Sequence, residues 1–182
     1  MSEKVELTEL TNNILSIFEA ENVNELPEKV KVCVSKNDFK KYQAFKNMVN
    51  DLSQDWLQKI FQYHLADRKE KMQDYTPKSL AKLMGSLALK NNDDKIIDMC
   101  AGSGALTIQT WNLNHDIKFE CLEFDENVIP ILLFNLAVRN IKATVKHMDV
   151  LQNDVMAVYQ VIPRAEFSEV VKIDNYNQQS AI

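Results

Sequence analysis

Glycine is scarce in this chain, and its placement constrains the fold more than any other feature. The 182 residues contain three glycines, and two of them, Gly102 and Gly104, fall in one short loop. The loop follows an apolar segment, residues 95–100, and precedes a segment of helical character that extends to about residue 113. Glycines permit positive φ and let a ligand approach the backbone. The pattern predicts a strand, a tight turn and a helix, and open α/β sheets bind ligands at that end of their strands.

The segments around this loop alternate between strand-like and helix-like patterns. Alternation of this kind favours an α/β domain with a mainly parallel sheet and helices on both faces. Residues 155–161 fit either a helix or a strand. We expect a helix that Thr76 caps and Pro77 begins, a helix over 126–139, and strands over 95–100, 117–123, 143–147 and 167–173.

The N-terminal part is predicted to be a separate helical region. Apolar residues at helical spacing predict a helix over 7–17 and a long amphipathic helix over 42–63, which Asn37 or Asp38 caps. The alternation at 30–34 instead suggests a short strand or an extended link. Residues 67–74 form a charged link. We therefore divide the chain into a helical region, residues 1–72, and an α/β domain, residues 73–182.

Composition excludes several classes of protein. Lys plus Arg is 21 and Asp plus Glu is 26, so the net charge is 21 − 26 = −5. A generally basic surface that coats nucleic acid is not expected. No apolar run is long enough for a membrane span, and the cysteines and histidines have no metal-ligand spacing. Three cysteines without a secretory signal indicate reduced thiols, and we expect a cytoplasmic protein.

Polar side chains follow three of the predicted strands. Asp98 lies at the end of the strand before the glycine loop, Glu123 ends the next strand, and Asp149 follows the third. An acidic residue in the position of Glu123 can accept hydrogen bonds from both hydroxyls of a ribose. Asp149 could face an adenine edge, or it could cap a turn. A glycine pair alone could also be only a turn, but the three carboxylates together indicate a nucleoside site.

Two motifs resemble those of the adenine-specific N6 DNA methyltransferases, above all the modification subunits of type I restriction–modification systems. They are Gln73-Asp-Tyr-Thr-Pro77 and Asp98-Met-Cys-Ala-Gly-Ser-Gly104. The resemblance covers about residues 70–155. It implies a class I methyltransferase-like, Rossmann-like sheet that binds S-adenosylmethionine. In that family the first motif opens the cofactor pocket, the second holds the methionine part, and the two later carboxylates contact ribose and adenine. The cofactor-binding residues implied here are Tyr75, Thr76, Pro77, Asp98, Cys100, Ala101, Gly102, Gly104, Glu123 and Asp149.

The catalytic motif of that family, Asn-Pro-Pro followed by Tyr or Phe, has no counterpart here. The chain contains no Pro-Pro pair, and residues 172–176 have only a faint likeness to the motif. The catalytic residues therefore stay unknown. We expect an S-adenosylmethionine-binding DNA methyltransferase-like protein that needs a partner or a missing segment for catalysis. A non-catalytic cofactor-binding or accessory module, or a scaffold with an empty site, is the alternative.

The predicted sheet also lacks cover for its last strand. Exposed strand edges are usually paired, covered or blunted. We expect the N-terminal helices, a second copy of the chain or another chain to cover that edge. DNA is a further possible partner, although the negative net charge gives it no independent support.

Overall fold

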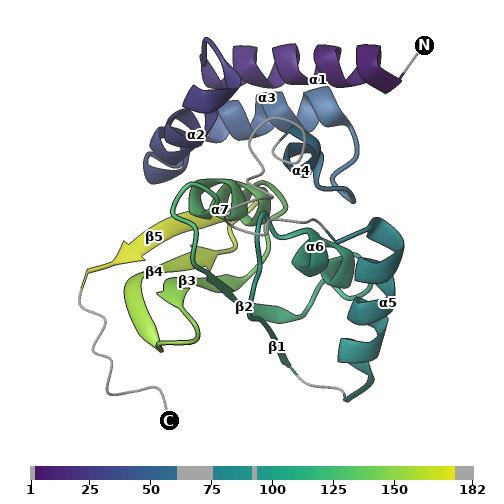
Figure 1. The fold of residues 1–182 in the computed structure, drawn as a ribbon, viewed down its shortest axis with the longest axis vertical. Helices are drawn as coiled ribbons and strands as arrows, with labels where there is room; N and C mark the ends of the chain where they lie inside the picture. The colour runs from purple at the N-terminus through teal and green to yellow at the C-terminus, as the bar shows by residue number, and fades with distance from the viewer. Residues whose placement is uncertain (1–2, 61–75, 92–93, 175–182) are drawn as a thin grey trace.

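The structure is a computed structural model that describes residues 3–60, 76–91 and 94–174. The described residues form a five-stranded sheet with helices stacked on it (Figure 1). The strands are β1 (Lys95–Asp98), β2 (Lys118–Glu123), β3 (Ala143–Asp149), β4 (Asp154–Ile162) and β5 (Glu169–Ile173). The helices are α1 (Glu3–Phe18), α2 (Leu26–Ser35), α3 (Phe39–Val49), α4 (Trp56–Ile60), α5 (Lys78–Ala88), α6 (Ala105–Trp111) and α7 (Ile129–Val138), with short 3-10 turns at Val23–Glu25 and Leu89–Asn91.

The strands follow chain order across the sheet, β1-β2-β3-β4-β5. The first three are parallel, while β4 pairs antiparallel with β3 and β5 pairs antiparallel with β4. The α/β class is therefore confirmed, but the sheet is mixed rather than mainly parallel. The ambiguous segment 155–161 is a strand because a short turn after Asp149 returns the chain beside β3, where no crossover helix is needed.

The helices lie on one face of the sheet, and the expectation of helices on both faces is wrong for the described residues (Figure 1). That face carries the buried strand residues Phe119, Cys121, Val145 and Val161. The opposite face carries an ion-pair ladder in which Glu120 binds the Lys95 ammonium at 2.7 Å and the Lys146 ammonium at 2.6 Å. This face is partly buried, since the Glu120 and Lys146 side chains are each 16% exposed.

Helix α7 forms the centre of the core. All ten of its residues are buried, because the sheet covers one side and the N-terminal helices cover the other. A helix that is apolar all round needs such a double layer. The Phe134 ring meets the rings of Phe18, Tyr42 and Phe45 edge-on, at centroid distances of 5.0–5.2 Å. These contacts join α1 and α3 to the α/β domain.

Segment 30–34 is part of helix α2, so the predicted strand or link is wrong. Leu26, Val30, Cys33 and Val34 are buried, and their spacing is that of one helix face. The alternation of valines with polar residues had suggested a strand, but Pro27 in the first turn and burial against α7 select the helix.

The predicted long helix over 42–63 is broken. Helix α3 ends where Asn50 adopts a left-handed conformation with φ +54°, and α4 begins at Trp56. An Asx-type bond from the Ser53 amide to the Asp51 side chain stabilises the break. Asp38 caps α3 as predicted, by accepting from the Lys41 amide. The expected end of this helix and the charged link 67–74 lie outside the described residues.

Candidate functional site

The glycine loop lies between β1 and α6, as predicted. Gly102 has φ +53° and Gly104 has φ +93°, both of which favour glycine. A Cβ on Gly104 would also come within 3.0 Å of the Leu132 side chain. No atom lies within 4 Å of a Cβ built on Gly102. A ligand therefore has room to approach the backbone at Gly102, whereas Gly104 is required for packing.

Glu123 connects the glycine loop to the end of β2. Its Oε2 accepts a hydrogen bond from the Gly102 amide at 2.7 Å. Its Oε1 accepts from the amides of Phe124 at 2.9 Å and Asp125 at 2.8 Å. The carboxylate is therefore held by three backbone donors at the point where two parallel strands end. A ribose that donated to Glu123 would have to share the carboxylate with these amides or replace the hydrogen bond from Gly102.

Asp98 is buried at the end of β1. Its Oδ2 accepts from the Thr107 hydroxyl at 2.8 Å, and the Cys100 amide also bonds to its side chain. Burial raises the pKa of the Asp98 carboxyl, and the nearby Glu123 charge raises it further, while the hydrogen bonds act in the opposite direction. Two carboxyl groups thus face the glycine loop, and Asp98 is the more deeply buried.

A cleft of about 150 Å³ separates these groups. Its lining includes Thr76, Asp98, Cys100, Ala101, Gly102 and Glu123 among the predicted residues. Cys100 is exposed at the cleft, and Cys121 is buried. Pro77 and Gly104 support the lining from the start of α5 and the start of α6. Helix α5 begins at Lys78 without a side-chain cap, so Thr76 does not cap it. Tyr75 lies outside the described residues.

Asp149 is placed differently from the other carboxylates. Its Oδ1 accepts from the amides of Leu151 at 2.9 Å and Gln152 at 3.1 Å, so it caps the turn between β3 and β4. It does not line the described cleft. An adenine contact by Asp149 stays a prediction.

Sequence reasoning missed a buried polar network behind the loop. Asp55, which caps α4 through the Gln58 amide, accepts from the Ser103 hydroxyl at 2.6 Å and from the Asn135 amide group at 3.0 Å. Burial raises the pKa of Asp55, and the nearby Arg139 guanidinium and the hydrogen bonds lower it. An aspartate before a helix indicates a helix cap. It does not indicate that the same side chain contacts a loop 48 residues away in the sequence.

Arg139 extends this network to the segment before α4. Its guanidinium donates to the backbone oxygens of Leu52 and Gln54 and to the Asn135 side chain. Burial lowers the Arg139 pKa to about 10, and the Asp55 and Asp51 charges act against that decrease. The network therefore fixes the segment before α4 against both the glycine loop and α7.

The strand that carries Lys172 is far from this cleft. β5 is at the opposite edge of the sheet from β1, with three strands between them. A catalytic role for residues 172–174 beside the glycine loop is therefore excluded by the topology. Asn175 and Tyr176 lie outside the described residues. No cluster of possible metal ligands occurs among the residues that the structure describes. Within the same residues, no helix has the length and apolarity that a membrane crossing requires.

The cleft fits part of a nucleoside cofactor with an amino acid tail. The half-buried Gly102, a carboxylate at the end of β2 and a second carboxylate at the end of β1 suit ribose hydroxyls and an ammonium group. Ligand sites usually enclose about 300–1,000 Å³, so a cleft of about 150 Å³ would hold only a portion of such a molecule. Phe124, directly after Glu123, is 64% exposed and offers an apolar surface next to the ribose position.

The described residues form an α/β protein with an open, mixed sheet and a cleft beside the glycine loop. The sequence matches the N-6 DNA methylase family over residues 50–180. The chain therefore belongs to the N-6 DNA methylase family, as the two motifs had suggested. No curated protein and no solved structure shows significant similarity to it.

Proposed function

We propose that the chain binds S-adenosylmethionine in the cleft between the glycine loop and Glu123, and that it serves N6 methylation of adenine in DNA. The observation that carries this proposal is the hydrogen bond from the Gly102 amide to the Glu123 carboxylate, since it brings the glycine loop and the end of β2 together. The cofactor, when bound, supplies the methyl group. The chain would hold the ribose at Glu123 and the amino acid part near Asp98 and the loop amides.

Catalysis needs groups that this sequence does not supply in recognisable form. Transfer to an adenine amine requires a base outside the duplex and acceptors that orient the amine. The sequence has no Pro-Pro pair, and β5 lies at the wrong edge of the sheet. We infer that a partner or a further segment provides the catalytic residues. The same absence favours the second candidate, a non-catalytic cofactor-binding or accessory module.

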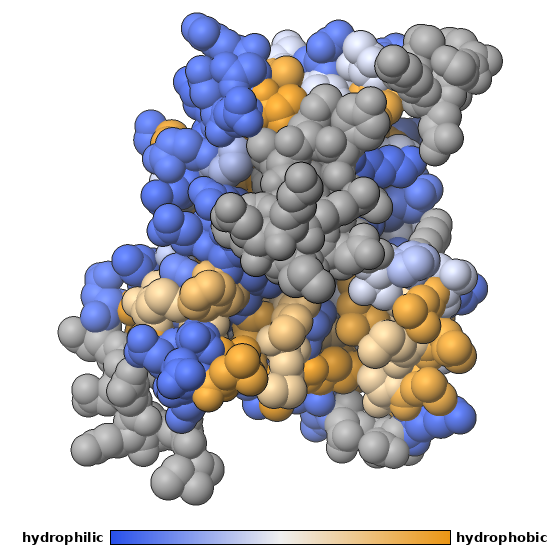
Figure 2. Space-filling view, viewed as in Figure 1, coloured by the Kyte–Doolittle hydropathy of each residue, from blue (hydrophilic) through white to orange (hydrophobic). Residues whose placement is uncertain are grey.

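The open side of the cleft indicates where such a partner would dock. Among the described residues β1 is an edge strand, and Ile97 and Met99 are 52% and 55% exposed. Beside it, α5 packs on α6 through Ala81 and Gly85 and leaves larger apolar side chains outside. Figure 2 shows this hydrophobic area at the lower right, over α5. Its members on α5 are Leu80, Leu83, Met84 and Leu87, which we call the α5 stripe.

The occupant that we propose for β1 and the α5 stripe is a separate chain with an apolar docking strand. The edge is next to Asp98, so a strand added there would bring its own residues to the cleft. A second copy of this chain is the competing occupant. Sedimentation equilibrium distinguishes the two occupants: a monomer supports the separate chain, and a dimer that Leu83→Glu dissociates shows a second copy.

A cytoplasmic location stays a prediction.

Calorimetric titration with S-adenosylmethionine tests cofactor binding. We expect binding that Glu123→Ala weakens by at least about tenfold, because a charge-assisted acceptor for the ribose is lost. Glu126→Ala is the matched control, since Glu126 lies in the same loop but outside the cleft lining. Equal weakening in both variants, or no binding by the unmodified chain, would contradict the proposal.

A further inference from the structure

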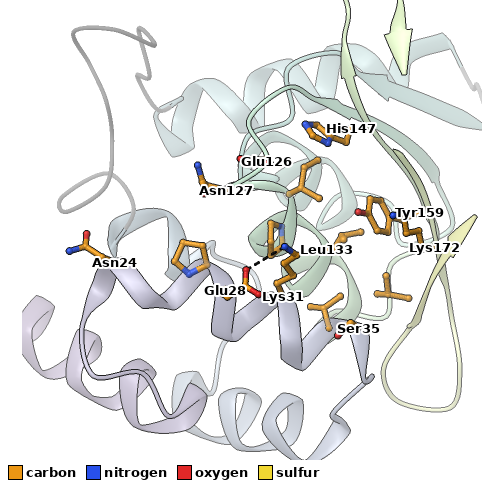
Figure 3. Close-up of a pocket in the computed structure, with 15 residues that line it drawn as sticks. Asn24, Glu28, Lys31, Ser35, Glu126, Asn127, Leu133, His147, Tyr159 and Lys172 are labelled. Atoms are coloured by element: carbon orange, nitrogen blue, oxygen red, sulfur yellow. Dashed lines mark hydrogen bonds and ion pairs between the residues drawn. The ribbon is translucent and has the colours of Figure 1, made fainter. Parts of the chain in front are cut away.

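A second, larger cavity lies on the other side of the loop that follows β2. It encloses about 500 Å³ between α2, the start of α7 and the strands β3 to β5 (Figure 3). That volume is within the range of small-molecule sites. Glu126 and Asn127 line this cavity, whereas Glu123 and Val128 line the cofactor cleft. The two cavities share no lining residue, so the larger one is a separate site.

Three polar side chains enter the cavity from adjacent strands. His147 is on β3, Tyr159 on β4 and Lys172 on β5. Tyr159 and Lys172 are register partners, so their side chains project from the same face of the sheet. Figure 3 shows the three on the sheet side of the cavity, opposite α2. The sheet therefore presents three polar side chains on one wall of the cavity.

The remaining walls are apolar on the α7 side, whereas Glu28 and Lys31 of α2 and Glu126 before α7 add charged groups. Val34 from α2, Pro130 and Leu133 from α7, and Val170 from β5 line the cavity. Leu133 and Val170 belong to the hydrophobic core, so the cavity reaches down to it. An apolar surface with a few convergent polar groups is the usual composition of a small-molecule site.

The donors differ in whether they already have partners. The Lys31 ammonium binds Glu28 at 3.3 Å, and His147 Nε2 lies 2.9 Å from the Phe124 carbonyl oxygen. For the half-buried Tyr159 hydroxyl and the exposed Lys172 ammonium, the described part of the chain provides no hydrogen bond or ion pair. An ammonium and a hydroxyl on one wall, neither of them paired within the described residues, favour a ligand that brings an anionic acceptor.

We propose that this cavity binds a small molecule that carries an anionic group, a carboxylate or a phosphate, on an apolar body. The anion contacts Lys172 and Tyr159, and the apolar body lies against Pro130 and Leu133. The site does not depend on cofactor binding in the cleft. Its ligand would lie beside His147, which contacts the residue that follows Glu123.

Phenyl phosphate is a suitable probe, because it joins an anion to an apolar ring. In titrations of the full chain followed by amide signals in nuclear magnetic resonance, we expect saturable shifts around Val170 with a dissociation constant of about 1–10 mM. Lys172→Ala should weaken binding about tenfold, and Tyr159→Phe about fivefold. Phenol and inorganic phosphate should each bind more weakly than phenyl phosphate.

Lys142→Ala is the matched control, because Lys142 is an exposed lysine at the other end of β3. It should leave the affinity unchanged. The absence of saturable shifts, equal affinities for the Lys172→Ala and Lys142→Ala variants, or displacement of the probe by S-adenosylmethionine would each overturn the proposal. A chain that binds phenyl phosphate but not S-adenosylmethionine would contradict the proposed function alone.

Discussion

The two halves of the sheet are covered to different depths. Over β3 to β5, α7 is buried on all sides because the N-terminal helices form a second layer above it. Over β1 and β2, α6 and α5 are the described cover, and the α5 stripe has no second layer among the described residues. The difference shows that the described residues complete a two-layer core on one half and leave apolar side chains exposed on the other, next to the glycine-loop cleft.

The edges of the sheet differ in the same way. On β5, the Asn37 side chain accepts from the Val170 amide at 2.7 Å and donates to the Val170 oxygen at 3.1 Å, so it imitates a neighbouring strand. Such a side chain blunts the edge against further pairing. β1 has no equivalent cap among the described residues. We therefore expect additional strands to pair at β1 rather than at β5.

The largest effect is expected where the two halves are joined. Asp55→Ala removes the acceptor of Ser103 and Asn135 and the larger of the two carboxylate charges that compensate Arg139, the other being Asp51. We expect the free energy of unfolding to fall by about 3–5 kcal/mol, measured by urea denaturation. Asp116→Ala changes an exposed carboxylate and should cost under about 0.5 kcal/mol. Similar losses in both variants would show that the network does not connect the halves.

Substitutions on the inner face of α5 should lower the free energy of unfolding, whereas substitutions on its outer face should leave it almost unchanged. A Cβ on Gly85 would come within 2.7 Å of the Thr110 hydroxyl and 3.1 Å of the Thr110 Cα, so Gly85→Leu overpacks the contact with α6. We expect a loss of about 1–3 kcal/mol in urea denaturation.

The matched change on the outer face is Leu83→Gln, since Leu83 is 56% exposed. It should alter the unfolding free energy of the isolated chain by under about 0.5 kcal/mol. A large loss in this variant would mean that the α5 stripe already has cover in the chain itself, and the docking surface would have to be abandoned.

The cap on β5 should make a smaller contribution. Asn37→Gly keeps the left-handed backbone, φ +49°, and removes both bonds to Val170. We expect a loss of about 1–2 kcal/mol and faster hydrogen exchange at the Val170 amide. Asn153→Gly is the control, because Asn153 has φ +53° and an exposed side chain. If exchange at Val170 stayed unchanged, Asn37 would not be the element that closes this edge.

The smallest effect concerns pH. Burial raises the folded-state pKa of Asp98 above its ordinary value of 3.8, so the folded chain retains a proton that the unfolded chain loses. The contribution of Asp98 to the unfolding free energy should therefore fall as pH rises through the interval between those two pKa values. Asp98→Asn should abolish this dependence, in urea denaturation at several pH values. An unchanged pH profile would mean that Asp98 is not desolvated in solution.

Sequence patterns predicted the half of the fold that surrounds the glycine loop. The strand, turn and helix there depend on local signals, namely two glycines and an apolar run, and the structure contains each of them. The α2 helix was not predicted because valine alternation mimics a strand, and burial against α7 decides the outcome. The antiparallel β4 also depends on a non-local pairing that a single segment does not reveal.

The candidate site shows the same limit. Asp98, Gly102 and Glu123 lie together because the parallel strands β1 and β2 have their carboxyl ends on the same side. Their spacing in the sequence was enough to predict this proximity. The contact of Asp55 with Ser103 arises from the packing of α4 behind the loop, and nothing in the local sequence indicates it. The sequence left open whether Asp149 faces an adenine or caps a turn, and in the structure it caps the turn after β3.

The Gly102 amide provides the most direct test of the central claim that cofactor binding uses the junction of the loop and Glu123. This amide donates to Glu123 Oε2 in the structure described here. On titration with S-adenosylmethionine, its nuclear magnetic resonance signal should shift until binding saturates, because the ribose hydroxyls donate hydrogen bonds to the Glu123 carboxylate in its place. Saturable binding that leaves the Gly102 signal in place would locate the cofactor elsewhere and contradict the account.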